Sequence, residues 1–175
     1  PPHPAFRLFI TVAPTPAFPP GLLQAGIKIT DDPPSGVRAG LRATFRDVVT
    51  QDTLDAVPGR AEWRPLVYAA AFMHALVLER RRFGPLGWVV PYDFGREDLA
   101  AVLAFLQRHL SGLGGGDGSS AGPSSAQAPP PSWDAIRYMA ASIQYGGRIT
   151  ADYDQRVMDA YAGRCLGVGV LAVGR

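Results

Sequence analysis

Hydrophobic residues recur with a helical period along most of this chain of 175 residues. From residue 35 onward, apolar side chains fall three or four positions apart, which places them on one face of a helix. The pattern predicts helices over residues 35–49, 51–56, 62–82, 96–110, 132–146 and 150–162. Because such amphipathic helices are stable only when their apolar faces pack together, we expect a helical subdomain over residues 35–162.

Several predicted helices have residues at their ends that favour initiation or termination. Ser35, Ser132 and Thr150 stand where a side-chain oxygen caps a helix N-terminus. Gly146 and Gly147 follow the fifth helix, and we expect one of them to end it with a positive φ angle. In the last helix, the spacing predicts an inner face made of Tyr153, Val157, Met158 and Tyr161.

The first 34 residues have a different pattern. Residues 6–12 are a short run of apolar and β-branched residues bounded by prolines, and residues 27–30 alternate between apolar and polar positions. Both segments therefore predict β-strands. Two short strands cannot bury a core of their own, so we expect residues 1–34 to be the edge of a larger α/β domain.

Three segments lack a helical or strand period. Residues 83–94 are rich in aromatic residues and proline, which favours a loop pinned against the helices. Residues 111–131 are almost entirely Gly, Ser, Ala and Pro, and we predict a disordered insertion there, because they offer little apolar surface to bury. Residues 163–175 have no pattern that predicts a structure.

Composition excludes several classes of protein. Hydrophobic residues make up 47% of the chain and charged residues 18%, with a net charge of +2 that is spread along the sequence. The single cysteine, Cys165, forbids an intrachain disulfide, and the three histidines lie far apart, so no metal site is expected. We expect no signal peptide, and the sequence has no run long enough to predict a membrane-spanning helix. We expect an intracellular protein with no affinity for nucleic acid or membranes.

The sequence contains no recognisable catalytic or cofactor-binding motif. A phosphate loop ends in Lys-Ser or Lys-Thr after a run of glycines, whereas the only lysine is Lys28, far from the glycines of the insertion. Asp152 and Asp154 stand two positions apart and so point to different sides of a helix. His74 falls within a long apolar helix, where a packed imidazole is the simpler interpretation. We therefore expect no catalytic, cofactor-binding or metal-binding residues.

Five segments resemble motifs of dynein heavy chains, in the same order and at similar spacing. They are HPAFRLFIT with FPPGLLQ (residues 3–11 and 18–24), IKITDDPPSG (27–36), ERRRFGPLGW (79–88), IRYM (136–139) and QYGGRIT (144–150). The resemblance implies the end of the large subdomain of the sixth AAA+ module, over residues 1–34, followed by its helical lid. The implied fold is thus mainly α, with two strands of an α/β remnant before the lid.

In this family the sixth module is not one that hydrolyses nucleotide, which agrees with the absence of motifs. The resemblance places Thr11 where active modules have their sensor residue, and no arginine follows before Ile27 to serve as an arginine finger. It also singles out residues of the lid motifs as structural candidates: Gly84, Pro85, Gly87, Trp88, Tyr145, Gly146, Gly147 and Arg148. Residues 163–175 no longer resemble the family, so the chain is either truncated or ends in a foreign sequence.

The resemblance further implies the setting of the chain. It is expected to be a non-catalytic part of a motor ring whose other modules bind ATP and Mg²⁺, and which moves towards microtubule minus ends. The implied partners are the rest of the ring, the dynein intermediate and light chains, and microtubules. The implied location is the cytoskeleton, with the cilium or flagellum axoneme preferred over the cytoplasm. A free-standing helical binding module is the alternative, and an autonomous ATPase is a third possibility that the missing phosphate loop disfavours.

Overall fold

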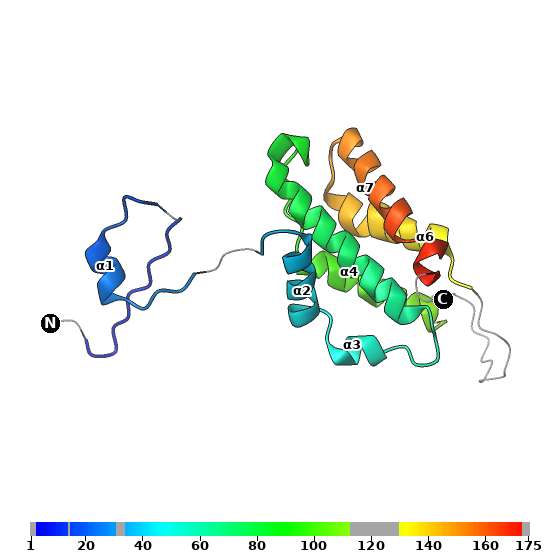
Figure 1. Ribbon diagram of the computed structural model, residues 1–175, viewed down its shortest axis with the longest axis horizontal. Coiled ribbons are helices and arrows are strands. Elements are labelled where there is room, and N and C mark those ends of the chain that lie inside the picture. The colour runs from blue at the N-terminus through cyan, green and yellow to red at the C-terminus, as the bar shows by residue number, and fades with distance from the viewer. Residues whose placement is uncertain (1–2, 14, 31–33, 113–129, 173–175) are drawn as a thin grey trace. The chain divides into compact units, whose positions relative to one another are not determined.

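The computed structural model describes residues 3–13, 15–30, 34–112 and 130–172 (Figure 1). The chain divides into two compact units, Pro1–Pro33 and Pro34–Arg175. The predicted insertion, residues 111–131, falls mostly outside the described residues.

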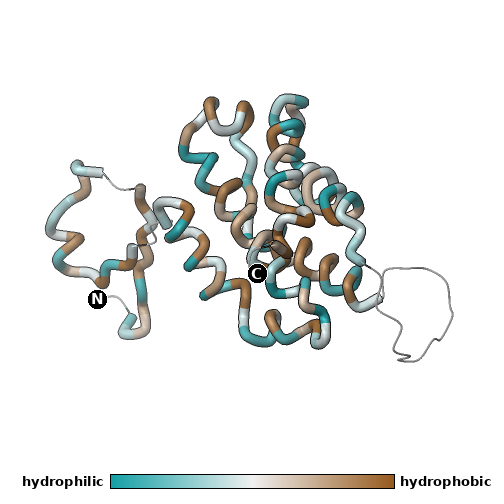
Figure 2. Tube along the Cα trace, turned by 45° about the vertical axis from the view of Figure 1, so that its right-hand side comes forward, coloured by the Kyte–Doolittle hydropathy of each residue, from teal (hydrophilic) through white to brown (hydrophobic). Residues whose placement is uncertain are grey.

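The described residues of the N-terminal unit contain one short helix. Helix α1 (Pro20–Ala25) begins with a proline, which suits a first helical turn and was not predicted. Residues 6–12 and 27–30 form no strand among the described residues, so the prediction of two strands is not confirmed. A strand is defined by ladder hydrogen bonds to a neighbour, and neither segment has one here. Hydrophobic positions recur along this unit (Figure 2), and Phe9 and Ile27 are 89% and 94% exposed.

The second unit is a helical bundle, as predicted (Figure 1). Its first half contains α2 (Val37–Asp47), α3 (Gln51–Asp55), α4 (Trp63–Arg80), the 3-10 helix η1 (Arg81–Leu86) and α5 (Arg96–Leu110). Its second half contains α6 (Trp133–Arg137), the π-helix η2 (Tyr138–Tyr145), the 3-10 helix η3 (Gly146–Arg148), α7 (Asp152–Cys165) and the 3-10 helix η4 (Val168–Leu171).

Helix α4 lies at the centre of this bundle. It packs against α2, α5 and α7 (Figure 1). Most of its surface is apolar, so it is buried on several sides rather than along one stripe. Its fully buried side chains include Leu66, Val67, Met73 and Val77, and small residues between them let the neighbouring helices approach closely. The core of the bundle is therefore built around one helix.

The helix starts follow the predictions only in part. Ser132 caps α6, because its side chain accepts a hydrogen bond from the backbone N–H of Ala135. The other two predicted caps are wrong. Ser35 precedes the true N-cap, Gly36, whose φ of 90° favours glycine, and the Ser35 hydroxyl instead accepts a hydrogen bond from Arg82. The N-cap of α7 is Ala151 rather than Thr150, and no side chain caps that helix.

The helix that begins at Trp133 changes its hydrogen-bonding pattern at Tyr138. From there to Tyr145 it is a π-helix, in which each turn holds one residue more than an α-helical turn. Helix α7 braces this segment, because Gln155 Nε2 donates to the carbonyl oxygen of Ala141 at 3.3 Å. Hydrophobic periodicity does not distinguish the two helix types over so short a distance, so the sequence analysis missed the π-helix.

Gly146 and Gly147 end the π-helix without a positive φ angle, so that prediction is wrong. Gly146 instead has helical φ and ψ angles, and glycine is required there because the surrounding atoms leave no room for a side chain. A Cβ atom there would lie 2.8 Å from Gln155 Oε1 and still closer to the carbonyl oxygen of Ala141. At Gly147 an added Cβ would meet nothing within 4 Å.

The inner face of α7 differs from the prediction at one position. Met158 is fully buried, as expected, but Tyr153 is 58% exposed and the neighbouring Asp154 is fully buried. The helix continues to Cys165, and Leu166 beyond it is buried in the core. Part of the segment for which the sequence predicted no structure is therefore helical and contributes to packing.

The two neighbouring glycines allow a direct test of the close approach. Replacing Gly146 by Ala should destabilise the chain by about 1–3 kcal/mol, because a methyl group would be forced against the Ala141 carbonyl. Replacing Gly147 by Ala should change the stability by less than about 0.5 kcal/mol, since the methyl would enter open space. Urea denaturation of both variants measures the difference. Equal losses of stability would contradict this assignment.

Candidate functional site

The structural candidates of the lid lie on two loops that contact each other. The first loop runs from η1 to α5 and contains Gly84, Pro85, Gly87 and Trp88, and the second runs from Tyr145 through η3 to the start of α7. We call the contact between residues 84–98 and residues 145–154 the loop junction. It is made of hydrogen bonds and ion pairs that the following paragraphs describe. Thr11, the remaining candidate, is an exposed residue of the N-terminal unit.

Two buried side chains supply acceptors for backbone groups across the junction. The carboxylate of Asp154 accepts from the backbone N–H groups of Val89 at 3.1 Å and Val90 at 3.4 Å. The Tyr92 hydroxyl accepts from the N–H groups of Thr150 and Ala151 at 3.3 and 3.2 Å. Each loop thus satisfies partly buried backbone donors of the other, which have no helical partner there.

Arg148 joins the second loop to the start of α5. Its guanidinium donates to the backbone carbonyl of Asp93 and forms an ion pair with Asp98, at 3.1 Å between Nη2 and Oδ1. The other oxygen of Asp98 accepts from the N–H of Gly95 at 2.9 Å, which closes the N-terminus of α5. Arg148 is half exposed, whereas the Asp98 side chain is 6% exposed, so the pair is partly shielded from water.

Arg80, at the end of α4, holds the first loop from the other side. Its Nε donates to the carbonyl of Gly87 at 2.6 Å, and its Nη1 donates to the Tyr161 hydroxyl at 3.0 Å. Its guanidinium carbon lies 5.6 Å from the ring centres of both Trp88 and Tyr161, which is cation–π geometry. Gly87 is required here, since a Cβ atom would collide with the Arg80 carbonyl.

The aromatic side chains of the two loops form one buried cluster. Trp88, Tyr92, Phe94 and Tyr145 are all at most 5% exposed. Their ring centres are 5.5–6.1 Å apart in tilted or edge-to-face arrangements, which aromatic pairs prefer. This burial confirms that the aromatic loop is pinned to the helices, although Phe83 at its start remains 63% exposed.

His74 and Tyr145 form a buried polar pair beneath this cluster. Their Nδ1 and hydroxyl oxygen atoms are 2.8 Å apart. Burial lowers the pKa of His74 to about 4, against the smaller opposite effects of the Asp98 and Glu97 charges. Burial also raises the pKa of Tyr145, and the charge of Asp98 raises it further. Both groups are therefore neutral at physiological pH, and His74 is a packed core residue, as the sequence suggested.

The remaining candidates have simple positions. Gly84 has a φ of 55° within η1, a conformation that favours glycine, and Pro85 follows it inside the same 3-10 helix.

The roles of Arg80, Tyr92 and Asp154 were not predicted from the sequence. The aromatic loop and the acidic pair were noted, but nothing in the periodicity indicates that Asp154 faces inward. The available signal was that the Asp154 carboxylate stands one helical turn from apolar residues that were expected in the core.

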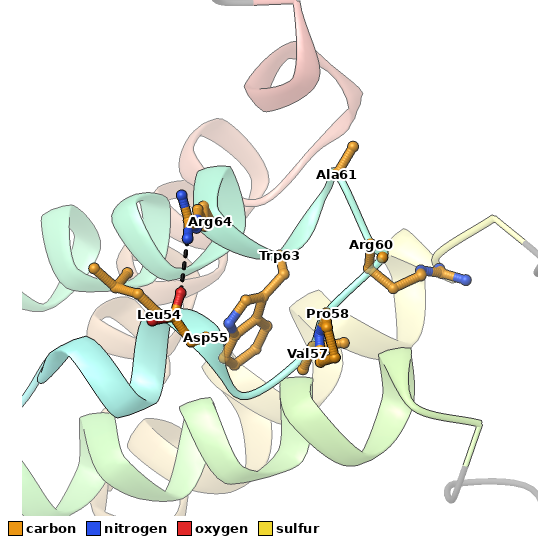
Figure 3. A pocket seen from close by; sticks show the side chains of 9 residues that line it. Leu54, Asp55, Val57, Pro58, Arg60, Ala61, Trp63 and Arg64 are labelled. Atoms are coloured by element: carbon orange, nitrogen blue, oxygen red, sulfur yellow. Dashed lines mark hydrogen bonds and ion pairs between the residues drawn. The ribbon is translucent and has the colours of Figure 1, made fainter.

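No reactive arrangement accompanies this junction in the described residues. They contain no group of three side chains that could hold a metal ion. None of the described helices is long and apolar enough to span a membrane. A shallow, open depression of about 520 Å³ lies beside the turn between α3 and α4, and the Arg64–Asp55 ion pair closes one side of it (Figure 3). The junction's polar groups are instead engaged with one another.

Sequence comparison identifies the family. The model of the "Dynein heavy chain AAA lid domain" matches residues 63–172, which is more than half of the chain. The chain belongs to the dynein heavy chain AAA lid family. The match includes residues 163–172, which the sequence analysis had placed outside the resemblance. The whole loop junction of this AAA lid lies inside the matched residues.

Several curated dynein heavy chains are similar to this lid. The dynein gamma chain of the flagellar outer arm of Chlamydomonas reinhardtii is 49% identical over 160 residues, which is 91% of this chain and 3% of the relative. Dynein axonemal heavy chain 5 of Mus musculus is 46% identical over 91% of the chain. Dynein axonemal heavy chain 8 of Homo sapiens is 42% identical over 90% of the chain. The chain spans about 3% of the length of each of these relatives.

Asp154 is expected to be required for the stability of the loop junction. Replacing it by Asn should cost about 1–3 kcal/mol, since the amide offers one acceptor oxygen in place of two and leaves a partly buried N–H unpaired. Asp152→Asn is the matched control, because Asp152 is exposed in the same helical turn and loses the same charge. Chemical denaturation at neutral pH compares the two variants. A loss at Asp154 no larger than at Asp152 would contradict this role.

The buried His74 is expected to make the stability depend on pH. Because its pKa is lowered to about 4 in the fold, the unfolded chain binds the proton more readily between pH 6.5 and 4. The free energy of unfolding thus has its full value above pH 6.5, and it should fall by about 2–3 kcal/mol as the pH drops towards 4. Unfolding free energies measured over this range in His74→Gln should show a weaker dependence than in the unsubstituted chain. His3→Gln, which changes an exposed histidine, should retain the full dependence.

Proposed function

We propose that this chain is a non-catalytic, structural part of a dynein heavy chain motor ring. It supplies the helical lid of the sixth AAA+ module, together with the end of that module's large subdomain. Its role is to close the ring and to transmit conformational change between neighbouring parts. ATP binding and hydrolysis, with Mg²⁺, belong to other modules of the same polypeptide.

The loop junction is the observation that carries this proposal. It ties the end of α4, the start of α5 and the start of α7 together through buried hydrogen bonds of Asp154 and Tyr92 and through the Arg80 and Arg148 guanidinium groups. Such cross-connections favour a body that moves as one piece. The absence of a phosphate loop from the sequence supports a role outside hydrolysis.

The names of the relatives support the wider setting of the proposal. Those quoted above are axonemal or flagellar dynein heavy chains, so we place this chain in the axoneme of a cilium or flagellum. There it contributes to ATP-driven movement towards microtubule minus ends. Its partners are the rest of the heavy chain and, through it, the intermediate and light chains and microtubules.

The size of the native polypeptide tests the proposal. An antibody against residues 132–161 should detect a band of several hundred kilodaltons on a denaturing gel, enriched in isolated cilia or flagella. An antibody against a known axonemal protein serves as the loading control. A band near 18.7 kDa would contradict the proposal and would favour a free-standing binding module instead.

The structural role can be tested separately in the intact heavy chain. Gly146→Ala should slow microtubule gliding while leaving ATP binding at the other modules unchanged, because it disturbs the lid and no nucleotide site. Gly147→Ala, at the neighbouring position with open space, should glide at the unsubstituted rate. Saturable ATP binding by the 175-residue chain at micromolar concentration would overturn the non-catalytic assignment.

A further inference from the structure

Helix α2 has a row of three arginines on its outer side. Arg38, Arg42 and Arg46 are spaced four residues apart, so they lie on one face of the helix. All three are exposed, whereas the opposite side of α2, with Leu41 and Val48, packs towards the core beside α4. We call these three residues the arginine row.

The charges of the arginine row are poorly compensated within the described residues. Arg46 pairs with its neighbour Asp47, at 2.7 Å between Nε and Oδ1. Arg38 and Arg42 form no ion pair with any residue that the structure describes. The row therefore presents at least two unneutralised guanidinium groups, one turn apart, on an open helix face.

This arrangement is unfavourable for the isolated helix. Like charges four residues apart on a helix repel each other. Arg38 also stands in the first turn of α2, which contains no acidic residue, and there a positive charge opposes the helix dipole. An anionic partner would remove both costs, which gives a physical reason for the row.

An aromatic strip runs beside the arginine row. Phe45 of α2 is followed by Tyr68 and Phe72 of α4, with ring centres 6.2 and 6.4 Å apart. Tyr68 is 54% exposed, although it lies in the middle of the central helix. Arginine and tyrosine side chains side by side are typical of the energetic centre of protein–protein interfaces. The composition of this face thus favours a protein over other anionic partners.

We propose that the arginine row docks against an acidic segment of the same heavy chain, outside residues 1–175. The inference rests on the proposed function. Its occupant is argued from charge complementarity and from the length of the relatives, of which the chain spans about 3%. Carboxylates spaced one helical turn apart would match the guanidinium groups, which bind carboxylates in a bidentate manner. An apolar side chain of the same segment would cover Tyr68.

Zero-length cross-linking in the intact heavy chain tests this interface. The variant Arg42→Lys keeps the charge and introduces an amine that a carbodiimide joins only to a carboxylate in direct contact. Because Lys28 is the only lysine of the 175 residues, the new cross-link is readily assigned by mass spectrometry. We expect the amine at position 42 to be joined to an Asp or Glu of a heavy-chain peptide outside residues 1–175.

Two control variants calibrate the yield. Arg64→Lys should give a cross-link to Asp55, because these side chains form an ion pair at 2.7 Å. Arg108→Lys, at an exposed arginine on α5 outside the row, should give little or none. Neutralising the flanking positions by Arg38→Gln and Arg46→Gln should lower the yield at position 42 several-fold, whereas Arg108→Gln should not.

Three outcomes would overturn the inference. The first is that position 42 is cross-linked only to residues within 1–175, Asp31 and Asp32 included. The second is a cross-link to a separate polypeptide. The third is that position 42 forms no cross-link although Arg64→Lys still reacts with Asp55. A native polypeptide of several hundred kilodaltons combined with any of these would refute the interface and leave the proposed function intact. A native polypeptide near 18.7 kDa would refute the proposed function first.

Discussion

The lid depends on satisfying the backbone of residues 87–95, which crosses the bundle without regular secondary structure. Buried N–H and C=O groups require partners, and this loop supplies only some of them from its own backbone. Asp154 and Tyr92 meet this requirement for backbone groups on both sides, and Arg80 and Arg148 do so for the carbonyl groups of Gly87 and Asp93. Side chains from three other segments, Asp154, Arg80 and Arg148, thus bind this irregular stretch, and Tyr92 within it binds the backbone before α7 in return.

This constraint also explains which parts of the structure the sequence could predict. Helices α4 and α5 were predicted nearly to the residue, since their apolar positions and end residues agree with their packing. The loop junction could not be placed in the same way. Asp154 and Arg80 look like ordinary helix-surface charges in the sequence, and only the tertiary contact of two loops shows that both are structural. The resemblance to dynein heavy chains singled out residues of the two loops but neither of these two residues.

The errors have specific physical causes. Thr150 and Ser35 have side chains of the kind that caps a helix. However, the Tyr92 hydroxyl accepts from the backbone N–H of Thr150, and the Arg82 guanidinium donates to the Ser35 hydroxyl. At Gly146 the expected positive φ is wrong, and close contact with the Ala141 carbonyl is what excludes a side chain. The two strands predicted near the N-terminus need neighbouring strands, and the described residues provide none.

The π-helix has a consequence for how this chain tolerates insertions and deletions. A turn of π-helix contains one residue more than an α-helical turn, so it can lose a residue by reverting to the commoner form. Both its ends, towards Ile136 and towards Tyr145, would then keep their places in the core. A deletion inside α4 or α5 would instead rotate every following side chain by about 100° and expose the buried face. Among the helices of the bundle, length variation is therefore expected to concentrate between residues 138 and 145.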